Sequence, residues 1–181
     1  MSILDNIKRK FSDFSYNRRS KRKRSVIALN IKSANKVGII YRADSEESFE
    51  LVKRYVKFLR EYKIKVRTIG YFSEKEIPHD VNPKLEFDYF CKKDLNFQLE
   101  PRCVVVDNFM EEKFDILLDV TVEDDKVLRN PVFFSNATFK IGAAGKKSSD
   151  DLDFMITLKE GEGIRQLMKG IDHYLHIINT D

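Results

Sequence analysis

The stretch of residues 36–72 constrains the fold of this chain more than any other part. It opens with a strand-like apolar segment, residues 37–41, and closes with a second one, residues 66–72. Between them, apolar side chains recur at the 3.6-residue period of a helix: Phe49, Val52, Val56 and Leu59. They form one apolar face, with which the helix can lie on a sheet. A strand, a long helix and a strand in so short a span predict a right-handed βαβ unit with parallel strands.

The turn before this helix indicates how the helix begins and which ligand it disfavours. Asp44 is expected to cap the helix, with Glu47 three residues on reaching back to it. A nucleotide phosphate in this turn would need a glycine for close approach, and the turn has none. The carboxylates of Asp44, Glu46 and Glu47 would also repel an anion. We therefore expect no dinucleotide site here.

The rest of the chain continues the alternation of strands and helices. The nearly continuous apolar run at residues 114–122 predicts a central strand buried on both faces, and residues 85–90 alternate like an edge strand. Residues 26–31 predict a brief strand or a helical turn. Further strands are expected at 139–142 and 154–158, and further helices at 104–113, 126–136 and 162–179. The pattern predicts one Rossmann-like α/β domain over residues 26–181, a mostly parallel open sheet with helices on both faces.

Positive charge is concentrated at the N-terminus. Residues 1–24 hold nine cations and two carboxylates, a net charge of +7, so the remaining residues carry −3 of the total of +4. The nine cations are Lys8, Arg9, Lys10, Arg18, Arg19, Lys21, Arg22, Lys23 and Arg24. Such a basic arm (residues 1–25) on a mildly acidic body points to a polyanionic partner.

RNA is the partner that this arm favours, and ribosomal RNA is the expected target. The nine cations would neutralise phosphates, while Phe11, Phe14 and Tyr16 would stack on exposed bases. Two alternatives stay open, because Ile3, Leu4 and Ile7 share a helical face with the two phenylalanines. That face could lie in an anionic membrane surface, or it could dock on the domain and leave the arm without a partner.

The expected carboxyl ends of the central strands provide a second candidate site. Open α/β sheets bind ligands at this edge, where Asp119 and the acidic residues 123–125 are predicted to lie. Gly142, Gly145 and Lys146 follow the next strand but lack the spacing and the hydroxyl of a P-loop. A solvated acidic loop and a solvated turn are the first interpretation. A small-ligand site or an enzyme active site built from Asp119, Gly142, Gly145 and Lys146 is the alternative.

Other signals of catalysis or cofactor binding are weak in this sequence. His173 and His176 share one side of the last helix without a third ligand, so neither a metal nor a cofactor is predicted. Cys91 and Cys103 have no metal-type spacing and are expected to be free thiols in a reducing cytoplasm. No catalytic signature appears. The sequence contains no run of about twenty apolar residues, so no transmembrane helix is predicted.

Five segments of the chain carry a resemblance to a known family: residues 49–59, 92–96, 105–109, 114–119 and 171–175. Together they resemble an uncharacterised family of Bacteroidetes proteins. The resemblance covers nearly the whole chain, and it implies no activity.

A weaker similarity is to the N-terminal half of heptosyltransferase-type glycosyltransferases. It rests on a strand like residues 114–120 that is followed by a helix and by a strand ending in Ile141-Gly142. The chain lacks the second domain that would bind the sugar nucleotide. This likeness therefore implies a related Rossmann-like fold without that reaction.

Overall fold

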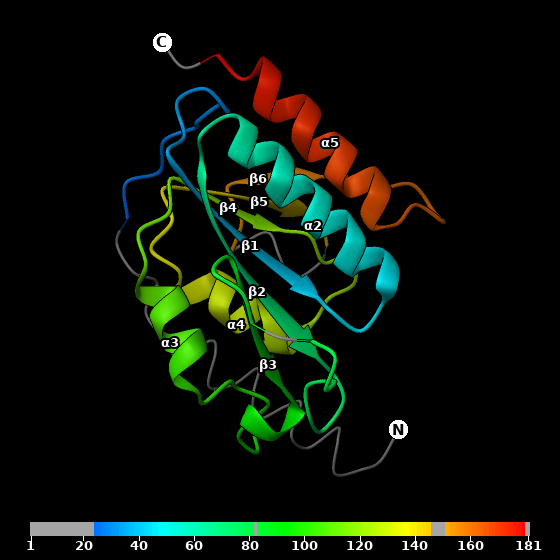
Figure 1. Cartoon of the computed structure of the whole chain (residues 1–181). Coiled ribbons are helices and arrows are strands. Elements are labelled where there is room, and N and C mark those ends of the chain that lie inside the picture. The colour runs from blue at the N-terminus through cyan, green and yellow to red at the C-terminus, as the bar shows by residue number, and fades with distance from the viewer. Residues whose placement is uncertain (1–23, 82, 146–150, 180–181) are drawn as a thin grey trace.

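A computed structural model of the chain describes residues 24–81, 83–145 and 151–179. Its six strands form one sheet in the order β3-β2-β1-β4-β5-β6, and every neighbouring pair is parallel (Figure 1). The strands are β1 Lys36–Arg42, β2 Lys65–Phe72, β3 Phe87–Cys91, β4 Ile116–Asp119, β5 Phe139–Ala143 and β6 Phe154–Ile156. The predicted open α/β sheet is confirmed, and it is parallel throughout.

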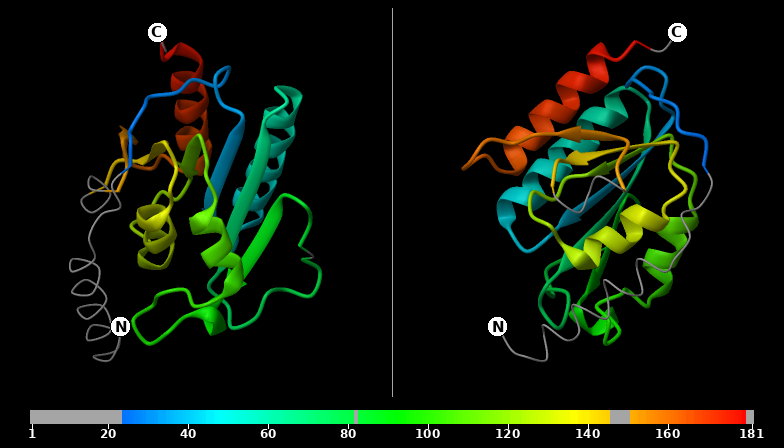
Figure 2. Two further views of the ribbon diagram at one scale, coloured as in Figure 1. Left: turned by 90° about the vertical axis from the view of Figure 1, so that its left-hand side faces the viewer. Right: turned by 180° about the vertical axis from the view of Figure 1, so that it is seen from behind.

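Helices cover both faces of the sheet. They are α2 Glu46–Glu61, α3 Val104–Glu111, α4 Lys126–Phe134 and α5 Ile164–Ile177, with a short 3₁₀ helix at Lys92–Asp94. The pair α2 and α5 lies on one face, and the pair α3 and α4 lies on the other (Figures 1 and 2). This three-layer arrangement separates the apolar core into two halves on either side of the sheet.

β1 is at the centre of this core. Ile39 points to the half covered by α2 and α5, and its neighbour Ile40 points to the half covered by α3 and α4. Both side chains are fully buried, as expected for successive residues of a strand that has layers on both sides. The backbone of β1 pairs with β2 on one side and with β4 on the other.

The helix that follows β1 begins one residue later than the capping pattern predicted. Ser45, not Asp44, is the N-cap, and its hydroxyl accepts a hydrogen bond from the amide of Ser48 at 3.1 Å. Asp44 instead accepts a hydrogen bond from the amide of Ser73 at 2.6 Å. The prediction was wrong because Asp44 has a partner at the end of β2 that sequence spacing cannot show.

Two other segments differ from their predictions. Residues 26–30 form neither a strand nor a helical turn. A turn begins at Ile31, and the amide of Ile31 donates a hydrogen bond to the carbonyl of Leu175. The central strand β4 is shorter than the apolar run that predicted it. Phe114 and Val120 lie outside the strand but are still buried, because the core extends beyond the ends of the hydrogen-bonded ladder.

Arg24, the first residue that the structure describes, is bound to the amino-terminal edge of the sheet. Its guanidinium donates to the carbonyls of Ala137 and Thr138, both at 3.2 Å, just before β5. It also pairs with Asp153, next to β6, at 2.5 Å. The C-terminal end of the basic arm is therefore fixed to the body, and the other eight arm cations lie outside the described residues.

Replacing Arg24 by alanine is expected to destabilise the body. The substitution leaves two carbonyls and a mostly buried carboxylate without their charged donor, a loss of about 1–3 kcal/mol in the free energy of unfolding. Lys32→Ala removes an exposed cation that has no side-chain partner among the described residues. This control should change the free energy of unfolding by less than about 0.5 kcal/mol. Urea denaturation of both variants measures the difference, and equal stability would contradict the anchoring role.

Candidate functional site

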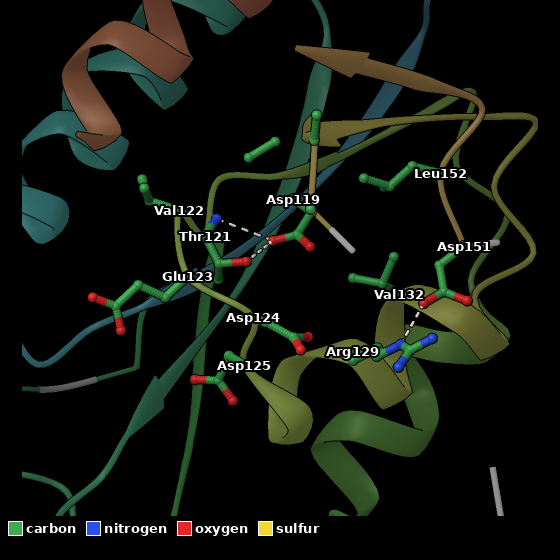
Figure 3. A pocket seen from close by; sticks show the side chains of 13 residues that line it. Asp119, Thr121, Val122, Glu123, Asp124, Asp125, Arg129, Val132, Asp151 and Leu152 are labelled. Atoms are coloured by element: carbon green, nitrogen blue, oxygen red, sulfur yellow. Dashed lines mark hydrogen bonds and ion pairs between the residues drawn. The ribbon is translucent and has the colours of Figure 1, made fainter. Parts of the chain in front are cut away.

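A small pocket lies at the carboxyl edge of the sheet, where the sequence placed a candidate site. It opens between the ends of β4 and β5, beside the first turn of α4, and has a volume of about 50 Å³ (Figure 3). Its charged lining residues are five acids, Asp119, Glu123, Asp124, Asp125 and Asp151, and one cation, Arg129. The loop and helix that follow β4 supply most of these side chains.

Asp119 is the last residue of β4 and points into this pocket (Figure 3). Its Oδ1 accepts hydrogen bonds from the hydroxyl and the amide of Thr121, at 2.6 and 3.0 Å. Burial raises the pKa of Asp119 to about 6, and the charges of Asp125 and Asp151 act in the same direction, against the lowering effect of Thr121. The carboxyl group therefore changes its charge near neutral pH.

A basic residue closes the crevice beside this pocket, where the strand order reverses between β1 and β4. Arg42, at the end of β1, donates to Asp44 at 2.9 Å and to Asp125 at 2.7 Å. Asp125 in turn caps α4 by accepting from the amides of Val127 and Leu128. Sheets of this order bind nucleotides at this position, but here the two loops are tied together by an internal ion-pair network.

A second ion pair lies on the far wall of the pocket. Arg129 of α4 donates to Asp151 at 2.7 Å, and the Asp151 side chain is only 2% exposed (Figure 3). A carboxylate this deeply buried needs such a partner, because desolvation of an unpaired charge is costly. The pair therefore fixes the start of the segment that leads into β6.

The structure brings together two of the four residues proposed as a ligand site. Asp119 and Gly145 line the same pocket, while Lys146 lies outside the described residues. Gly142 is buried within β5, where an added Cβ would lie 2.9 Å from the side chain of Leu152 and 3.0 Å from the carbonyl of Asp119. Close packing therefore explains why this position is a glycine.

The volume of the pocket limits what it can hold. Sites for small organic molecules usually measure about 300–1,000 Å³, several times the roughly 50 Å³ found here. The space suits one or two water molecules, which occupy about 30 Å³ each in the liquid. Within the described ranges, no group of three His, Cys, Asp or Glu residues could hold a metal ion.

The histidines and cysteines that the sequence singled out have local partners in the structure. His176 Nδ1 lies 2.7 Å from the carbonyl oxygen of Asp172 and its ring contacts Tyr62, whereas His173 contacts Tyr174. Burial raises the pKa of the free thiols of Cys91 and Cys103, which makes them poorer nucleophiles.

A second surface, which the sequence analysis did not identify, lies between α2 and α5. A shallow groove of about 310 Å³ lies between these helices, and its lining combines apolar side chains with three cations and one carboxylate. Its lining residues are Leu51, Arg54, Tyr55, Phe58, Arg165, Met168, Lys169 and Asp172. The density of lysine and arginine in residues 53–63 was the sequence signal that could have indicated it. None of the helices in the described parts of the chain could cross a membrane.

Asp119→Asn is expected to stabilise the protein above about pH 6. The pKa of Asp119 is about 6 in the folded state against its ordinary value of 3.8, so the wild type loses stability as pH rises through this window and the carboxylate ionises. Asparagine keeps an acceptor for Thr121 without the charge. We expect a gain on the order of 2 kcal/mol at neutral pH that disappears below about pH 4.

Urea denaturation at acidic and neutral pH measures this effect. Glu123→Gln is the control, because Glu123 is an exposed acid on the same pocket and its substitution should change stability by less than about 0.5 kcal/mol at either pH. A pH-independent difference between the wild type and Asp119→Asn would contradict the raised pKa.

Comparison with known proteins identifies the family of this chain. No curated protein and no solved structure matches the chain. The model of a family of unknown function, DUF6913, matches residues 7–178, which includes most of the basic arm and nearly all of the α/β body. The chain therefore belongs to the DUF6913 family.

Proposed function

We propose that this protein binds RNA through its basic N-terminal arm, and that its α/β body holds the arm in place. The observation that carries the proposal is the separation of charge along the chain, +7 over residues 1–24 against −3 over the rest. Lysine and arginine side chains at this density neutralise phosphates and release bound counterions, which gives affinity without sequence readout. Ribosomal RNA is the target we expect, in the cytoplasm.

The geometry of the body supports a role for the arm. Arg24 fixes the end of the arm to the amino-terminal edge of the sheet, beside β5 and β6. The acidic pocket lies at the opposite, carboxyl edge, where it would repel a polyanion. Because the fold uses Arg24, we base the proposal on the other eight cations.

The two alternatives have less support. The carboxyl-edge pocket, as the described residues form it, measures about 50 Å³ and is too small for a nucleotide or a sugar nucleotide. An anionic membrane surface would use the same eight cations as RNA, but the body presents a mildly acidic charge to such a surface. RNA can be contacted by the arm alone, without bringing the whole body close to the polyanion.

The test compares two full-length variants that each lose eight positive charges. In the arm variant, Lys8, Arg9, Lys10, Arg18, Arg19, Lys21, Arg22 and Lys23 become glutamine. In the control variant, exposed lysines of the body outside α2 and α5 become glutamine: Lys32, Lys65, Lys75, Lys84, Lys92, Lys93, Lys113 and Lys159. Both variants keep Arg24 and have the same net charge.

Fluorescence anisotropy with a labelled fragment of ribosomal RNA gives the affinity at several salt concentrations. We expect the arm variant to lose at least about a hundredfold in affinity and most of its salt dependence, because each lost phosphate contact lowers the slope by about 0.7–0.9. The control should change affinity far less. Equal loss in the two variants, or binding of the arm to anionic vesicles without RNA binding, would overturn the proposal.

A further inference from the structure

Cations gather on α2 and α5 beyond the first turn of α2, which is acidic with Glu46 and Glu47. Residues 53–63 and 165–176 hold seven lysines and arginines against two carboxylates, although the chain beyond residue 24 is net negative. Three of these seven cations pair with acids: Lys53 with Glu50, Arg60 with Glu86 and Arg165 with Glu47. The other four have no ion pair within the described residues: Arg54, Lys57, Lys63 and Lys169.

The two helices that form this groove contact each other at both of its ends. At the amino ends of the helices, Arg165 of α5 pairs with Glu47 of α2 at 3.1 Å. At the carboxyl ends, the ring of His176 lies 6.1 Å from that of Tyr62 and 6.3 Å from that of Phe58. The two helices therefore run parallel, side by side, as Figure 1 also shows.

Between these ends the groove combines apolar and charged side chains. Leu51, Tyr55 and Met168 supply apolar lining. Arg54 of α2 and Lys169 of α5 supply cations, and Asp172 adds one carboxylate. Its volume of about 310 Å³ is six times that of the acidic pocket and reaches the range of small-molecule sites. A planar apolar group with an attached anion matches this combination of apolar and cationic lining.

Aromatic rings extend the groove at its carboxyl end. Tyr55 stacks on Phe58 with 5.6 Å between ring centroids, and Phe58 lies 5.0 Å from Tyr62. Tyr62, the C-cap residue of α2, is 44% exposed, so part of it is open to a partner. Exposed aromatic faces among unpaired cations are the recurring design of sequence-tolerant single-stranded nucleic acid sites.

We propose that the groove between α2 and α5 is a second RNA-binding surface, which takes a base of a single-stranded segment beside Tyr62 and the flanking phosphates on Arg54 and Lys169. This inference rests on the proposed RNA binding by the arm, and extends it to the body. An acidic peptide would use the cationic lining of the groove, but it would leave the aromatic end and the cations beyond the groove, Lys57 and Lys63, unexplained.

The path of the chain makes joint binding by the arm and the groove feasible. From Arg24 at the sheet edge, the chain reaches Ile31, whose amide donates to the carbonyl of Leu175 in α5 at 3.0 Å. Seven residues span at most about 25 Å, so the root of the arm lies within a few nucleotides of the carboxyl end of the groove. One RNA strand could then contact both, and the second contact would benefit from a high effective concentration.

The test uses the full-length chain and a labelled single-stranded RNA of about 20 nucleotides in mixed sequence. We expect Arg54→Gln/Lys169→Gln to lower the affinity about tenfold and to reduce the salt slope by about 1.4, or about 0.7 for each phosphate contact on a single strand. The matched control Lys75→Gln/Lys159→Gln removes two exposed cations outside the groove, and should stay within about twofold of the wild type.

A second pair of variants separates stacking from charge. Tyr62→Ala should lower the affinity by about fivefold or more at every salt concentration, and Tyr62→Phe should restore it, because phenylalanine keeps the stacking face. Circular dichroism melting identifies any variant that fails to fold, and Tyr62→Phe retains the ring contacts if Tyr62→Ala is unstable.

The outcomes distinguish this inference from the proposed function. If the groove variants bind RNA like their control while the arm variant does not, the groove inference is overturned and RNA binding by the arm stands. If the wild type itself does not bind RNA, both are overturned. Unchanged RNA binding together with lost binding of an acidic amphipathic peptide would assign the groove to a protein partner, and would also overturn the inference.

Discussion

The burial of β1 on both faces is the constraint on which the rest of the structure depends. Ile39 and Ile40 point into opposite halves of the core, so each half needs its own pair of helices. The backbone of β1 is paired on both sides, which places the sheet's reversal point beside it, between β1 and β4. The carboxyl-edge pocket, the closed crevice and the groove between α2 and α5 all take their positions from this arrangement.

Acidic and basic side chains lie on different edges and faces of this framework. At the carboxyl edge, Arg42 and Arg129 are held by carboxylates, and burial raises the pKa of Asp119, with a smaller contribution from the charges of Asp125 and Asp151. At the amino edge, Arg24 fixes the end of the basic arm. The outer face of α2 and α5 keeps unpaired cations such as Arg54. The protein thus presents positive charge away from its acidic pocket, which is the arrangement expected when the partner is a polyanion.

The sequence predicted the fold well because hydrophobic periodicity depends on local spacing. The pattern at Val52, Val56 and Leu59 and the apolar run around β4 both located their elements correctly. Predictions that required knowledge of distant partners failed or were incomplete. Asp44 looked like a helix cap until the structure placed the amide of Ser73 beside it, and the groove requires two helices far apart in sequence to lie side by side. The pairing of Arg24 with Asp153 spans 129 positions and has no local signal.

Ultraviolet crosslinking of the full-length protein to RNA, followed by mass spectrometry of the crosslinked peptides, tests the central claim most directly. Our account predicts crosslinked peptides from residues 1–24, with a second group from α2 and the carboxyl end of α5, and none from the acidic loop at residues 119–125. The absence of crosslinks from the arm, or crosslinks confined to the carboxyl edge of the sheet, would contradict it.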